Sequence, residues 1–98
     1  MSIDIFVQDM VHGTVHRVDG PAGDTLSESV LQAPVGSMLR GIHQYADTMF
    51  NSYQLRFFLD ELAATAPADD AQREMITTLR DVAEQAIRIN GYLWFSGD

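Results

Sequence analysis

The middle of the chain, residues 47–55, reads Asp47-Thr48-Met49-Phe50-Asn51-Ser52-Tyr53-Gln54-Leu55. Asn51 is a preferred N-cap residue, and Gln54 lies three positions later, which is the spacing of a capping box. In a capping box the Asn51 side chain accepts a hydrogen bond from the Gln54 backbone N–H, and the Gln54 side chain reaches back. Phe50 and Leu55 flank the cap in the positions of a hydrophobic staple. The stretch therefore predicts that a helix begins at Ser52.

Asp47 and Thr48 lie just outside this predicted helix, and two interpretations apply to them. As structural residues they satisfy backbone donors in the turn before the cap, a role for which turns select Asp and Thr. As functional residues, together with Asn51 and Gln54, they form a polar cluster in which Asp47 holds an arginine of a partner or the amine of a ligand. We favour the structural role, because the sequence places no base, nucleophile or metal ligand nearby.

Two helices are predicted after the cap, over residues 52–64 and about 69–89. Both segments repeat apolar residues at the helical period, and residues 65–68 break the chain between them. Asp69 with Gln72 repeats the cap pattern at the start of the second helix. Helices joined by so short a linker pack as an antiparallel hairpin.

Residues 2–8 alternate with a period of two and predict a strand, in which Phe6 among the polar positions indicates a partly covered second face. A turn at His12-Gly13 leads to a short second strand over residues 14–18. Residues 92–96 are strand-like through their aromatic content. We therefore expect one α+β domain over residues 1–98, a small two-layer domain whose helical hairpin packs on a short sheet formed by the N- and C-terminal strands.

The segment between these elements is less regular. Residues 19–24 read as a loop, and residues 25–28 resemble a capping box before a short helix that stops ahead of Pro34. Residues 35–46 fit a helical period that two glycines interrupt, so the sequence favours helix and extended chain equally there.

Composition sets the class of protein. The chain has 98 residues, of which 46% are apolar, and this predicts a single globular domain with a modest core. It has no cysteine, which excludes disulfides, a thiolate nucleophile and Cys-based metal sites. No apolar run reaches transmembrane length and no basic, apolar leader opens the chain, so we expect a cytoplasmic protein without a membrane segment.

Charge narrows the class of partner. Fourteen acidic residues outnumber six basic ones, all of them arginine, and give a formal net charge of −8. This balance argues against direct binding to nucleic acid or anionic membrane, which needs a basic surface. It favours attraction to a basic protein, although net charge also serves solubility alone.

Two stretches resemble a group of small, uncharacterised bacterial proteins, namely Tyr45-Ala46-Asp47-Thr48-Met49-Phe50-Asn51 and Leu93-Trp94-Phe95-Ser96-Gly97-Asp98. Members of the group begin with a short strand, carry an Asp-Thr-x-Phe-Asn-x-x-Gln segment before a helical pair, and end on a strand followed by Gly-Asp. The resemblance spans most of the chain, with residues 10–35 matching least. It implies this organisation, with residues 35–46 extended or irregular, and it carries no activity to transfer.

No enzyme template fits the sequence. It has no nucleophile elbow, phosphate-binding loop or dinucleotide fingerprint, so we assign no catalytic residue and no cofactor. His12, His16 and His43 could form a zinc trio with an open position. We favour ordinary surface or half-buried histidines and assign no metal, because no His-Glu-x-x-His motif or close acid pair accompanies them.

Two helix faces are candidate surfaces. On the second helix an acidic stripe lies opposite the apolar face, either as a solvated face or as a docking strip for a basic partner; it comprises Asp70, Glu74, Asp81 and Glu84. On the first helix Tyr53 and Phe57 point away from the apolar face, beside Asp60 and Glu61. We expect residues 20–45 to cover this aromatic pair; left uncovered, it would resemble an interface hot spot.

Three functions fit these features. The first is a non-catalytic inhibitor of a basic protein such as a toxin or nuclease, as an immunity protein or an anti-defence protein, acting through the two helix faces. The second is a small enzyme or ligand-binding protein that uses Asp47, Asn51 and the histidines, which predicts a pocket lined by them. The third is an accessory homo-oligomer, such as a homodimer, with Tyr53 and Phe57 as the contact. We favour the first.

Overall fold

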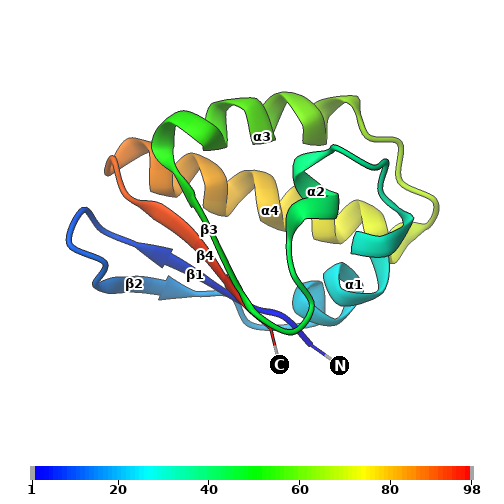
Figure 1. The fold of residues 1–98 in the computed structure, drawn as a ribbon, viewed down its shortest axis with the longest axis horizontal. Coiled ribbons are helices and arrows are strands. Elements are labelled where there is room, and N and C mark those ends of the chain that lie inside the picture. The colour runs from blue at the N-terminus through cyan, green and yellow to red at the C-terminus, as the bar shows by residue number, and fades with distance from the viewer. Residues whose placement is uncertain (1, 98) are drawn as a thin grey trace.

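The chain folds into two layers, helices over an antiparallel sheet, and the computed structural model describes residues 2–97 of it (Figure 1). The strands are β1 (Asp4–Gln8), β2 (Thr14–Arg17), β3 (Asp47–Asn51) and β4 (Tyr92–Ser96). The helices are α1 (Ala22–Ser29), a 3-10 turn η1 (Val30–Gln32), α2 (Met38–Gly41), α3 (Ser52–Ala64) and α4 (Asp70–Arg88). Over residues 2–97 no helix combines the length and the apolar character needed to cross a membrane.

The sheet has the order β2-β1-β4-β3, and every neighbouring pair is antiparallel. Strands β1 and β4 pair at its centre, so the N- and C-terminal strands meet beneath the helices and the α+β prediction is confirmed. The fourth strand, β3, was not predicted. It pairs with β4 from Asp47 opposite Ser96 to Asn51 opposite Tyr92.

The turn predicted at Asp47 and Thr48 is wrong, because both residues belong to β3. Pairing with the edge of β4 gives the backbone N–H and C=O groups of this segment more hydrogen-bond partners than a local turn would give them. No turn is needed before α3, since Asn51 has extended backbone (φ −82°, ψ 174°), as an N-cap requires. A single residue therefore ends the strand and caps the helix.

The predicted capping box is confirmed. The Asn51 Oδ1 accepts from the Gln54 N–H at 2.9 Å, and the Gln54 Oε1 accepts from the Asn51 N–H at 2.9 Å. At α4 the Asp69 carboxylate likewise accepts from the Gln72 N–H at 2.9 Å. Beyond the end of α4, Asn90 lies in the left-handed region at φ 51°.

Gly91 follows that helix end and joins α4 to β4. Its N–H donates to the Ala86 carbonyl at 2.8 Å, which completes the helix terminus. A Cβ at this position would lie 1.9 Å from the Gln8 carbonyl oxygen of β1. The turn therefore requires a glycine, because the backbone of β1 passes directly against it.

The start of the first helix was predicted wrongly. Helix α1 begins at Ala22, so Thr25 lies inside it, and the Thr25 hydroxyl donates to the Pro21 carbonyl at 3.1 Å instead of capping a later helix. Residues 35–46 contain only the single turn α2, whose N-cap Ser37 accepts from the Arg40 N–H at 3.1 Å. The remainder of that segment is irregular up to β3.

The core lies between the helices and the inner face of the sheet. Fully buried side chains from the strands meet those of α3 and α4, and Phe50, Phe58 and Phe95 form an aromatic cluster with centroid distances of 5.2, 5.6 and 6.3 Å. This packing fixes which face of each helix and strand remains outside.

Candidate functional site

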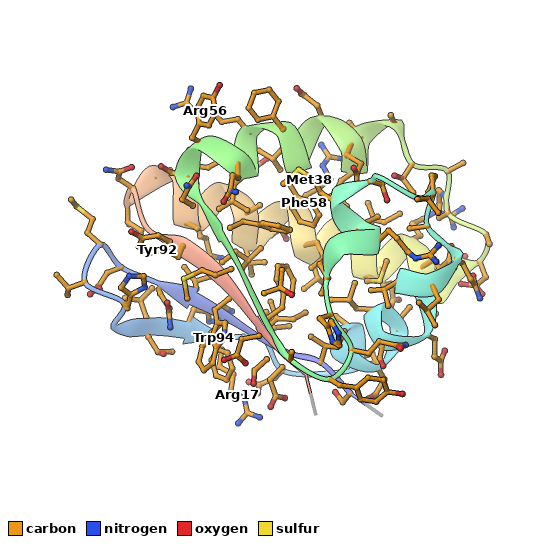
Figure 2. The ribbon with its side chains drawn as sticks, viewed as in Figure 1. Arg17, Met38, Arg56, Phe58, Tyr92 and Trp94 are labelled. Carbon is orange, nitrogen blue, oxygen red and sulfur yellow. The ribbon has the colours of Figure 1, made fainter. Side chains whose placement is uncertain are left out.

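The outer face of α3 is uncovered, so the prediction that residues 20–45 lie over it is wrong. Tyr53 is 69% exposed and Phe57 is 53% exposed. Their rings contact each other edge to face at a centroid distance of 5.1 Å. Figure 2 shows Arg56, from the same stretch of α3, pointing away from the sheet. We call the exposed side chains of Tyr53, Phe57 and Asp60 on this helix the α3 face.

Glu61 holds part of residues 20–45 at a distance from the two exposed rings. Its carboxylate accepts the backbone N–H groups of Met38 at 2.8 Å and of Leu39 at 2.9 Å, and so holds the start of α2 against the C-terminal half of α3. The Arg40 guanidinium then donates to the carbonyls of Leu31 and Ala33, each at 3.2 Å. Glu61 is half-buried and engaged within the fold, and we leave it out of the α3 face.

The acidic stripe of α4 is exposed along its length, at Asp70, Glu74, Asp81 and Glu84. Asp70 pairs with Arg73 at 2.7 Å, but both side chains are exposed, so this pair adds little stability. The other three acids form no ion pair with any of residues 2–97. Their charge is therefore left for solvent or for a partner.

The histidines lie apart. His12 stacks on Tyr92 with a centroid distance of 4.2 Å, and His16 is exposed on β2. His43 lies beyond the other end of the sheet, near Gly97, where its Nδ1 accepts from the Tyr45 N–H at 3.0 Å. Among residues 2–97 no group of three or more His, Asp or Glu is placed to hold a metal ion.

Asp47 and Asn51 do not line a pocket with the histidines. Both are exposed on the edge strand β3, and Thr48 uses its hydroxyl to accept from the His43 N–H at 2.9 Å. A cavity of about 430 Å³ lies elsewhere, between η1, α2 and the α3–α4 connection. Its apolar lining comes chiefly from Ala33, Pro34, Leu39, Ala64, Met75 and Ile76.

One surface was missed from the sequence, namely the outer face of the sheet. Phe6 and Trp94 stack there at 4.7 Å with an interplanar angle of 25°, and the Arg17 guanidinium lies 5.7 Å from the Phe6 ring. Figure 2 shows Trp94 and Arg17 on the side of the sheet away from α3, whereas Phe58 lies between the layers. The helices cover only one face in Figure 1, so the cover expected over Phe6 is not a helix. In the sequence this surface is indicated by Phe6 and Trp94, which alternate with the buried residues of β1 and β4.

Comparison with known proteins adds no family to this geometry. No family model matches the chain, and no curated protein or solved structure is significantly similar to it.

Proposed function

We propose that the protein is a non-catalytic binding protein of the cytoplasm that inhibits a basic partner protein through the α3 face. The observation that carries this proposal is the exposed Tyr53–Phe57 pair, which no part of residues 2–97 covers. Truncating an exposed aromatic anchor at an interface typically costs the most binding energy, and rigid tyrosine and phenylalanine rings lose little entropy on binding.

The charge of the chain supports a basic partner. The net charge is −8, and the acidic stripe of α4 belongs to the same helical layer as α3. Such a field speeds association with a cationic protein and repels nucleic acid and anionic lipid. An immunity protein against a basic toxin or nuclease, or an anti-defence protein, is the class that combines these properties.

Affinity capture from the native extract tests the proposal, with the partner then purified and its binding measured by calorimetry. The Tyr53→Ser/Phe57→Ser variant should weaken binding by about a hundredfold or more, because two anchors are lost. Tyr45→Ser is the matched control, since Tyr45 is 58% exposed but lies outside α3, and it should bind as the wild type does.

Salt provides the second readout. Replacing Glu74 and Asp81 by glutamine should slow association and flatten its salt dependence, with little change in the dissociation rate. A captured partner that is acidic, or one that binds the Tyr53→Ser/Phe57→Ser variant as tightly as the wild type, would overturn the proposal.

A further inference from the structure

The outer face of the sheet has a regular layout that follows from the strand register. One row across the sheet runs Arg17, Phe6, Trp94, Met49, from β2 to β3. The neighbouring row toward the chain ends runs Asp4, Ser96, Asp47. Since side chains alternate between faces, both rows project away from the helices. We call these two rows the outer sheet face.

The centre of the outer sheet face is apolar. Phe6 and Trp94 stack at 4.7 Å, and Met49 beside them is 39% exposed. Each ring shields the other, so both are only half-exposed even though no helix lies over them in Figure 1. A contiguous apolar centre with a polar rim is typical of a binding surface.

The charges at the rim exclude one class of occupant. Aromatic side chains on an open sheet bind single-stranded nucleic acid when a basic groove follows the phosphates. Here the two rows hold Asp4 and Asp47 against Arg17 alone. The face therefore fits a protein surface.

The same charges favour one orientation of a second copy of the chain packed on this face. Arg17 lies on the β2 edge and Asp47 on the β3 edge, at opposite sides of the sheet. We propose that the outer sheet faces of two copies pack together about a two-fold axis parallel to the strands, forming a four-on-four β-sandwich. This operation places β2 over the β3 of the second copy and β1 over its β4.

In that arrangement each Phe6 faces the Trp94 of the other copy, and Arg17 lies one row from the other copy's Asp47. The rows are about 7 Å apart along a strand and packed sheets are about 10 Å apart, which an arginine and an aspartate can bridge. A two-fold axis across the strands would instead set Arg17 against Arg17, and the repulsion disfavours it. The Arg17–Asp4 contact within one copy, at 3.4 Å between exposed groups, is weak and does not compete strongly.

The size of the face sets the strength. Four strands of about five residues span about 19 by 17 Å, or roughly 320 Å² in projection, and His12 already covers Tyr92 at one end of this area. This is well below the roughly 800 Å² that each partner buries in a standard interface. We therefore expect a weak dimer that dissociates on dilution rather than a permanent one. Asp4 and Asp47 are the acidic residues in these two rows, and salt screens the repulsion between the acidic residues that lie farther away.

Sedimentation velocity over a wide concentration range tests the dimer, with charge reversal as the geometric probe. Arg17→Glu and Asp47→Arg should each raise the dimer dissociation constant at least tenfold, and the double variant should restore it to within a few-fold. Asp81→Arg on α4 makes the same charge change as Asp47→Arg and should not weaken the dimer. Circular dichroism checks that each variant is folded.

A wild type that stays monomeric at all concentrations overturns the proposal, as does a dimer whose double charge reversal is no tighter than the singles. The inference does not rest on the proposed function. The Tyr53→Ser/Phe57→Ser variant should dimerise like the wild type, and a dimer lost in that variant would place the contact on α3 instead.

Discussion

The two faces of the sheet are made by the same strands and differ in what lies against them. Toward the helices β4 presents Leu93 and Phe95, which are fully buried, and away from them it presents Tyr92 and Trp94, which are half-exposed. Both faces are aromatic, so apolar content does not distinguish them. The helical hairpin buries the inner face of the sheet, and this burial stabilises the fold. The apolar side chains of the outer face remain available for contacts with another molecule.

The sharpest test of this difference compares one aromatic side chain from each environment. Phe58 is fully buried against Phe50 and Phe95, so Phe58→Ala should lower the free energy of unfolding by about 3–5 kcal/mol. Trp94→Ala, measured at a concentration where the chain is monomeric, should cost about 1–2 kcal/mol, from partial burial and the lost stack with Phe6. Urea unfolding measures both. Equal losses would mean that the outer face is part of the core.

A smaller effect is expected at the joint between the two layers. Gly91→Ala puts a Cβ against the Gln8 carbonyl, 1.9 Å away, and should destabilise the protein by about 1–3 kcal/mol as β1 or the turn shifts. Gly41→Ala is the matched control, because a Cβ there meets nothing within 4 Å, and it should change stability by less than about 1 kcal/mol. Similar values for the two variants in urea unfolding would contradict the close approach of β1 to this turn.

The smallest effect is expected where β3 meets α3. Asn51→Ala removes the side-chain acceptor of the Gln54 N–H and should cost about 1 kcal/mol, whereas Asn51→Gly should cost only a few tenths. Thermal unfolding of both variants measures the difference. Should the alanine variant unfold at the wild-type temperature, the cap would be dispensable and β3 alone would hold the start of α3.

Local chemistry determined which parts of the fold could be predicted. Helices α3 and α4 could be predicted from the side-chain caps at Asn51 and Asp69 and from apolar residues that repeat at the helical period. Helix α1 could not, because its N-cap residue, Pro21, makes no side-chain hydrogen bond. Thr25 resembles a cap residue but lies inside the helix. Strand β3 begins with Asp47 and ends with Asn51, residue types that are depleted in strands, so its sequence does not indicate that it pairs with β4.

The open surfaces were harder to predict for the same reason. Whether anything covers Tyr53 depends on the path of residues 20–45. Their apolar side chains Leu26, Val30, Leu39 and Ile42 lie in the core, and the Glu61 carboxylate also binds the backbone N–H groups of Met38 and Leu39. A backbone donor has no sequence signature, so no pattern could reveal the contact. The outer sheet face could be predicted only from the alternate residues of β1 and β4, and only after their pairing was known.

Asn51 both closes the ladder opposite Tyr92 and caps α3, and no linker separates the two elements. The first turn of a helix ordinarily frays by itself, because its leading N–H groups are held only by the cap. Here fraying would peel the end of β3 from β4 at the same moment. The end of β3 and the first turn of α3 therefore open together as one cooperative unit, and neither can fray without the other.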